Sequence, residues 1–276
     1  MIREIHKRER YMALSEQDLN DLQRAKRLLE NPSLASKITA ALGTPIEKGF
    51  ELLPDNWNVK IQELARKALV EALDIALLTM ENEPRIPAST KLHKLFGIAS
   101  GAIGGAFGLP ALVVELPIST TIMLRSIADV ARSEGEDLSD IGSKLACLQV
   151  FALGGSSTID DAAETGYFAV RSALAKTVSD ASAHIAEKGL SREGAPAIAR
   201  LIGKIAERFG IAVSQKAAAQ AVPLVGAGAG ALVNTLFIDH FQDIGRGHFT
   251  VRRLERAHGV EAVRKAFDNL QYSNNL

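Results

Sequence analysis

Cysteine and an excess of charge of one sign are both missing from this sequence, and each absence excludes a class of protein. The single cysteine, Cys147, can form neither an intramolecular disulfide nor a cysteine-ligated zinc centre. Lys and Arg number 32 together, as do Asp and Glu, so the formal net charge is zero. A dedicated nucleic-acid-binding domain normally has a basic excess, and we therefore expect no nucleic acid among the partners.

A secretory signal is missing as well. The first ten residues are rich in charge, and no apolar stretch of the kind found in signal peptides follows them. We therefore expect a cytoplasmic location. Hydrophobic residues make up 47% of the 276 residues, which is enough to offset the entropy of folding. We expect a helical N-terminal region over 1–88 and a helical core over 89–276, joined in one continuous domain.

Strand signals are sparse, and helix signals recur along the chain. There is no Asn-Gly or Asp-Gly hairpin turn, and only residues 148–153 have a composition compatible with a strand. Apolar residues instead repeat with the 3.6-residue period of a helix. Capping residues predict that one helix starts at Ser15 and another at Thr44-Pro45. The apolar period predicts seven more helices, over 57–82, 139–153, 158–188, 191–209, 210–237, 239–258 and 260–270. The expected fold class is all-α, a compact multi-helix bundle.

Two long uncharged tracts are the most conspicuous feature of the sequence. The first covers 97–114 and continues over 116–124 after a single charge at Glu115; the second covers 217–238. A membrane-spanning helix needs about 20 apolar residues, so length alone is compatible with insertion. Both tracts contain proline and several glycines, which contribute little transfer energy. We expect them to form the protein core, with membrane insertion or shallow docking as the alternative.

Small residues in both tracts repeat every four positions. Gly97, Gly101 and Gly105 do so in the first, and Gly226, Gly230 and Asn234 in the second. Four-residue spacing places such positions on one helix face, where a neighbouring backbone can approach closely. The sequence therefore predicts two central Gly/Ala-rich helical hairpins packed against each other.

Motifs in and after the two tracts resemble the signatures of the EcsC family of bacterial proteins. The central signature is matched by Gly104-Gly105-Ala106-Phe107-Gly108-Leu109-Pro110, Glu115-Leu116-Pro117, Leu124-Arg125-Ser126-Ile127-Ala128 and Gly135-Glu136-Asp137-Leu138. The C-terminal signature is matched by Pro223-Leu224-Val225-Gly226-Ala227, Gly230, Asn234, Arg253-Leu254 and His258-Gly259. The resemblance covers residues 95–259. It implies a helical fold and a cytoplasmic or membrane-proximal protein, and it supplies no catalytic residues.

Glu115 is the first candidate functional residue, because it interrupts an otherwise uncharged tract. A carboxylate in such surroundings must pair, accept hydrogen bonds or take up a proton. One interpretation is a ligand site in which Glu115, Arg125 and Asn234 face an apolar ligand between helices. The simpler interpretation is that Glu115 accepts N–H groups at the start of a helix. If Pro117 begins that helix, Arg125 can pair with Asp129.

A second set of candidates consists of acids and a histidine. Carboxylates four positions apart share a helix face, and a histidine beside carboxylates is typical of half a metal site. These residues predict a divalent metal site for hydrolysis, made from Asp160, Glu164, Asp239, His240 and Asp243. Ordinary solvated helix faces are the simpler interpretation.

The third set is basic. Residues 246–265 contain an excess of four positive charges, with apolar residues between them. A basic amphipathic helix can lie on anionic lipid, so Arg252, Arg253 and Arg256 are candidates for contact with head groups. A solvated face with Glu–Arg pairs explains the pattern equally well.

Together these observations predict a peripherally membrane-associated helical protein that binds lipid or another apolar ligand between its helices. The partner would be membrane lipid or a membrane protein such as a transporter subunit. The alternatives are a metal-assisted hydrolase built on the acidic residues, and an adaptor of a membrane transporter.

Overall fold

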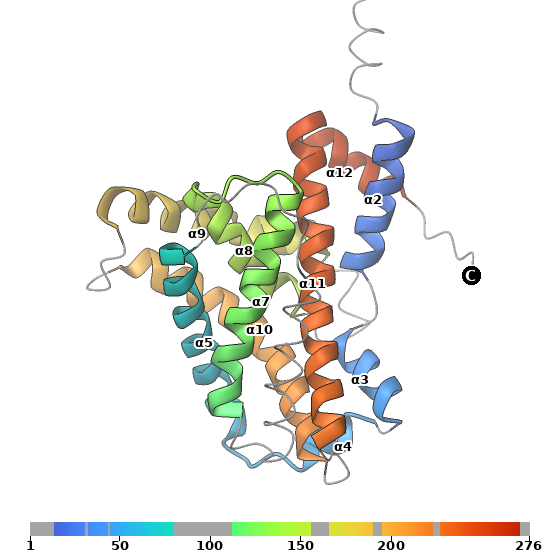
Figure 1. The fold of residues 1–276 in the computed structure, drawn as a ribbon, viewed down its shortest axis with the longest axis vertical. Coiled ribbons are helices and arrows are strands. Elements are labelled where there is room, and N and C mark those ends of the chain that lie inside the picture. Colours follow the sequence, from blue (N-terminus) through green and yellow to red (C-terminus); the bar gives the residue numbers. More distant parts are fainter. Residues whose placement is uncertain are drawn as a thin grey trace, which may run out of the picture.

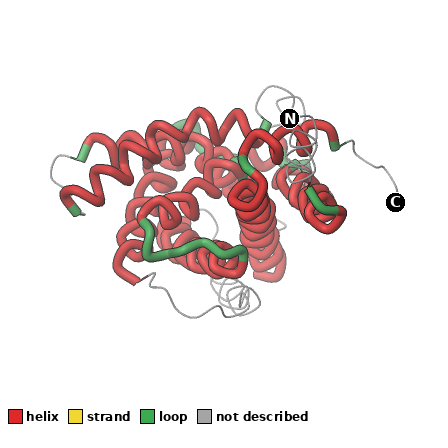
Figure 2. The backbone as a smooth tube through the Cα atoms, turned by 90° about the horizontal axis from the view of Figure 1, so that it is seen from above, coloured by secondary structure: helices red, strands yellow, loops and turns green. Residues whose placement is uncertain are grey.

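A computed structural model describes residues 14–30, 33–43, 45–79, 112–155, 166–189, 195–222 and 227–270. Every regular element within these ranges is an α-helix, and no strand occurs in them (Figure 2). The expected all-α fold class is confirmed. The helices are α2 (Glu16–Leu29), α3 (Leu34–Leu42), α4 (Glu47–Glu51), α5 (Trp57–Thr79), α7 (Leu112–Ser133), α8 (Ile141–Leu153), α9 (Tyr167–Lys188), α10 (Pro196–Ala221), α11 (Ala227–His258) and α12 (Val260–Asn269).

Local capping explains where several helices begin. The Ser15 side chain accepts the backbone N–H of Asp18 at 3.1 Å and caps α2, as predicted. Ser33 caps α3, which the sequence analysis did not anticipate. Asp140 caps α8 by accepting the Ser143 N–H at 2.8 Å, so this helix starts two residues after the predicted Ser139. Residues 148–153 lie inside α8, so the helix predicted to end at residue 153 is confirmed there.

Several predicted helix boundaries are also wrong. Helix α10 ends at Ala221, inside the helix predicted over 210–237, and α9 starts at Tyr167, inside the helix predicted over 158–188. The structure has one helix across Gly210, where a break was expected; Phe209 before it and Val213 after it are fully buried and hold this part of α10 in the core. Likewise α11 continues unbroken through Asp239, and its 32 residues make it about 48 Å long. Pro117 lies inside α7 instead of starting a helix. The segment 80–111, the predicted cap Thr44 and residues 158–165 lie outside the described residues.

The long helix α11 runs through the bundle, and other helices pack around it (Figure 1). It contacts α2, α3, α7, α8, α10 and α12, while α7 lies between α5 and α11. Helices α10 and α11 run in opposite directions and form a hairpin from the second uncharged tract (Figure 1). Phenylalanines join α8, α10 and α11 in the core; the rings of Phe151 and Phe209 are 4.9 Å apart, and those of Phe209 and Phe241 are 5.5 Å apart.

Close helix contacts depend on glycines outside the two tracts. A Cβ on Gly247 of α11 would lie 2.7 Å from Leu29 Cγ of α2, and a Cβ on Gly49 would lie 2.1 Å from the Ala218 carbonyl oxygen of α10. Gly97, Gly101, Gly105 and Gly226 of the predicted stripes lie outside the described residues. Within the described ranges, no helix combines the length and the apolar character needed to cross a membrane.

Candidate functional site

A buried polar cluster lies where α7, α10 and α11 meet. Lys216 Nζ of α10 donates to Glu115 Oε1 of α7 at 2.5 Å and to Asn234 Oδ1 of α11 at 2.7 Å. Gln220, one turn after Lys216, donates from Nε2 to Glu115 Oε2 at 3.4 Å. Lys216 and Asn234 are fully buried, and Glu115 is 4% exposed. The only charge within the first uncharged tract thus pairs with the last charge before the second.

The environment of Lys216 is apolar apart from these partners. Its Nζ lies 4.7 Å from the centre of the Phe237 ring. Burial lowers the pKa of Lys216, and the Glu115 carboxylate opposes this effect. A buried pair of this kind is held by mutual compensation, because removing one partner leaves the other charged in a medium that does not solvate it.

Glu115 and Asn234 were predicted from the sequence as site residues, whereas Lys216 was not. A signal was present: Ile205, Phe209 and Val213 form the buried stripe of α10, and Lys216 follows in the same helical phase. The structure places Arg125 elsewhere, on the exposed face of α7. Asp129 pairs with Arg132 at 2.7 Å.

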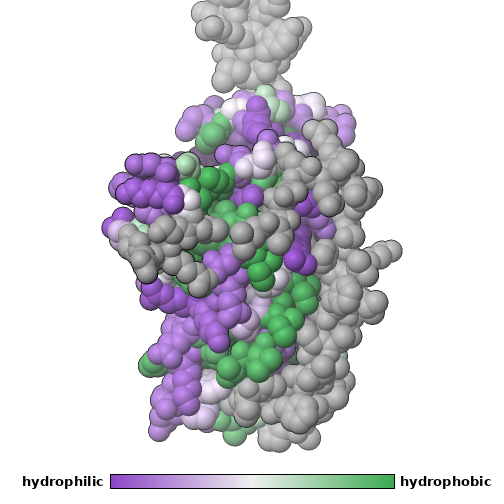
Figure 3. Space-filling view, turned by 60° about the vertical axis from the view of Figure 1, so that its left-hand side comes forward, coloured by the Kyte–Doolittle hydropathy of each residue, from purple (hydrophilic) through white to green (hydrophobic). Residues whose placement is uncertain are grey.

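That exposed face of α7 carries unusual side chains for a helix surface. Val114 and Ile118 are 67% and 49% exposed, and Val113 beside them is 43% exposed. Arg125 follows two turns after Ile118, so Val114, Ile118 and Arg125 form one stripe along the helix, with Val113 at its edge; these four residues are named here the α7 stripe. On the side of the molecule where α5 lies, Figure 3 shows a diagonal band of apolar side chains with hydrophilic ones to its left. Within the described residues no carboxylate pairs with Arg125.

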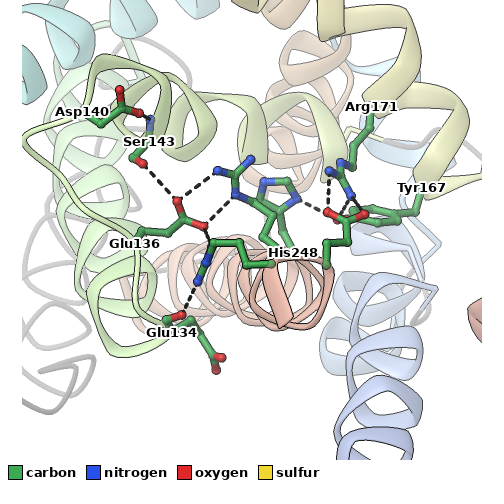
Figure 4. A network of polar contacts seen from close by, with 10 residues as sticks. Glu134, Glu136, Asp140, Ser143, Tyr167, Arg171 and His248 are labelled. Carbon is green, nitrogen blue, oxygen red and sulfur yellow. Dashed lines mark hydrogen bonds and ion pairs between the residues drawn. The ribbon is translucent and has the colours of Figure 1, made fainter. Parts of the chain in front are cut away.

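A second polar network surrounds Glu136, in the turn between α7 and α8 (Figure 4). Its carboxylate accepts two hydrogen bonds from Arg252, at 2.8 and 3.0 Å, one from Ser143 Oγ at 3.0 Å and one from Arg256. These partners lower the pKa of Glu136, although burial of the carboxyl, the largest single effect, acts in the opposite direction. The turn is made possible by Gly135, whose φ is 83°.

The network continues through α9. Arg171 donates to both carboxylate oxygens of Glu255, at 2.8 and 2.9 Å, and to Tyr167 Oη at 3.1 Å. Tyr167 Oη is in turn 3.0 Å from His248 Nδ1 (Figure 4). His248 is fully buried, and burial together with Arg171 and Arg252 keeps its pKa well below the usual value. These contacts tie α9 and the α7–α8 turn to α11.

All three arginines predicted to face lipid head groups are engaged in internal ion pairs. Arg252 and Arg256 bind Glu136, and Arg253 binds Glu134 at 2.7 Å and Asp21 of α2 at 2.8 Å. Their side chains are 28%, 42% and 36% exposed. Their charges are therefore largely compensated within the chain.

The predicted metal ligands are only partly described. His240 Nε2 donates to the Gly154 carbonyl oxygen at 2.7 Å, and burial lowers the pKa of this histidine to about 4. Asp243 pairs with Arg246 at 2.9 Å and lies 3.8 Å from Lys37; Asp239 is half-buried beside His240 in α11. Asp160 and Glu164 lie outside the described residues. Among the residues that are described, no group of three His, Cys, Asp or Glu side chains could hold a metal ion. The metal site stays a prediction.

A comparison with known protein families identifies the family of this chain. The model of the EcsC protein family matches residues 1–254, and the chain belongs to that family. Comparisons with curated proteins and with solved structures gave no match.

Proposed function

We propose that this EcsC family protein associates peripherally with the cytoplasmic side of a membrane, and that the α7 stripe is its docking face. The observation that carries the proposal is the exposure of Val113, Val114 and Ile118 on a helix whose inner face is otherwise well buried. Exposed aliphatic side chains that share one face are typical of an interaction surface, whereas isolated ones are not.

The position of Arg125 favours lipid as the partner. It lies seven residues after Ile118, about 10 Å along the helix axis, and on the same face. An arginine at this distance can keep its guanidinium among phosphate head groups while the aliphatic residues enter the interface. Arg252, Arg253 and Arg256 are weaker candidates for head-group contact because carboxylates of the same chain already compensate them.

Vesicle flotation tests the proposal. The wild-type chain should float with vesicles that contain anionic lipid, and Val114→Ser combined with Ile118→Ser should weaken binding about tenfold or more, since two partly buried aliphatic side chains are lost. Arg125→Gln should weaken binding to anionic vesicles about fivefold and leave binding to zwitterionic vesicles unchanged.

Val260, the first residue of α12, provides a matched control. Val260 of α12 is 54% exposed but lies far from the α7 stripe. Val260→Ser should therefore bind vesicles like the wild type. If the wild-type chain stays at the bottom of the gradient with every lipid composition, the membrane proposal is wrong.

A further inference from the structure

The first turn of α7, residues 112–116, is apolar except for one charge. Leu112 and Leu116 are fully buried, Val113 and Val114 are exposed, and Glu115 points inward to Lys216. The turn therefore combines an exposed half of the α7 stripe with a buried ion pair. Only Glu115 among these five residues opposes a move of the turn into lipid.

Pro117 weakens the connection between this turn and the rest of the helix. Proline has no N–H, so residue 117 cannot donate to the carbonyl of Val113, and its ring crowds that carbonyl. Just after it, Ser119 Oγ and Thr120 Oγ1 both donate to the Leu116 carbonyl oxygen, at 3.1 and 2.7 Å. Hydroxyls that bond back in this way often accompany helix bends.

Because the helical bond at Pro117 is missing, tertiary contacts add to what holds the turn in place. The shortest of them is the bond from Lys216 to Glu115, which connects α7 to α10, and Asn234 of α11 binds the same ammonium group. Gln220 adds a bond to the second oxygen of Glu115, while its own Oε1 is buried and has no partner within the described residues. An unsatisfied buried acceptor costs folding free energy, so the cluster stabilises the closed position of the turn less than a fully bonded cluster would.

We propose that the Glu115–Lys216 ion pair is a latch that holds residues 112–116 against α10 and α11, and that this turn swings about Pro117 into the lipid interface when the latch opens. The inference rests on the proposed membrane docking. In water, opening exposes Leu112 and Leu116, which keeps the latch closed. At a membrane, lipid replaces the protein as an apolar environment for both leucines, so the cost of opening falls.

Hydrogen exchange of the full chain tests the latch without lipid. The amides of Ile118 and Ser119 are informative, because their helical acceptors are the carbonyls of residues 114 and 115, on the other side of Pro117. In Glu115→Gln these amides should exchange about tenfold or more faster, while amides from 123 to 133 keep their wild-type rates. The double variant Glu115→Leu with Lys216→Met should restore slow exchange, because an apolar pair can replace the ion pair.

Vesicles are then added to the same proteins, with zwitterionic phosphatidylcholine as the lipid. Glu115→Gln should bind more tightly than the wild type, and the double variant more weakly than Glu115→Gln. Unchanged exchange in Glu115→Gln, or equal acceleration along all of α7, overturns the latch. If exchange accelerates locally but no variant binds vesicles, the latch is supported and membrane docking is wrong. If the wild type binds vesicles but exchange in Glu115→Gln is unchanged, docking is supported and the latch is wrong.

Discussion

Replacing Lys216 by methionine removes the centre of the buried cluster and leaves the Glu115 carboxylate without its cation. Glu115 is only 4% exposed and would keep one hydrogen bond in the cluster, from Gln220 at 3.4 Å. A buried carboxylate in this position must either stay charged without compensation or take up a proton. Both outcomes destabilise the folded state relative to the unfolded state.

The expected magnitude follows from measurements on other buried ion pairs. Removing one partner of such a pair typically costs about 3–5 kcal/mol of folding free energy. For a chain of this size that corresponds to a fall in Tm of about 6–20 °C. Replacing both partners, Glu115→Leu with Lys216→Met, should instead leave stability within about 1–2 kcal/mol of the wild type, because no buried charge remains.

Thermal and urea unfolding followed by the helical circular dichroism signal measure these differences, and the two single variants and the double variant complete a double-mutant cycle. A coupling free energy of about 3 kcal/mol or more is expected. If Lys216→Met lowers the free energy of unfolding by less than about 1 kcal/mol, the pair does not stabilise the packing of α7. The same conclusion follows if the double variant is no more stable than Lys216→Met.

Three further predictions concern the rest of the fold. In Glu136→Gln the ion pairs to Arg252 and Arg256 are lost, which should cost about 2–4 kcal/mol. Because the folded state lowers the pKa of Glu136, its contribution is present above the unfolded value of 4.5 and is lost as the pH falls, so Tm from pH 6 to 3 should fall less steeply in this variant. His240 has a folded pKa of about 4, below its unfolded value of 6.5, so wild-type stability should fall as the pH drops through that window; in His240→Gln, Tm should change less there. Gly247→Leu should displace α2 from α11, seen as faster hydrogen exchange over 16–29 while α9 keeps its rates; unchanged exchange in α2 contradicts the close packing at this glycine.

The sequence predicted the helices well where the signals are local. Ser15 and the apolar period after it predicted α2, and Val260 was predicted as the start of α12. The predictions failed where a tertiary contact overrides a local signal. Gly210 costs only about 1 kcal/mol in a helix, and burial of the nearby Phe209 and Val213 keeps α10 continuous there. The polar His240 is accommodated inside α11 because it binds the Gly154 carbonyl.

The polar cluster was predictable in part. Glu115 is conspicuous because it interrupts an uncharged tract, and Asn234 because it continues the four-residue spacing of Gly226 and Gly230. Lysine is so often exposed that Lys216 was not selected. Its helical phase was the usable signal. The ion pairs of the arginines were not predictable, because Glu136 and Arg252 are 116 positions apart and no local spacing relates them.

The depth of a single labelled side chain measures membrane docking most directly. Cys147 is buried, so a cysteine introduced by Val114→Cys can be labelled selectively with an environment-sensitive fluorophore. On addition of anionic vesicles the label should shift to the blue and become protected from an aqueous quencher, while the same label at Val260→Cys stays accessible. Equal accessibility of the two labels with vesicles present would contradict docking through the α7 stripe.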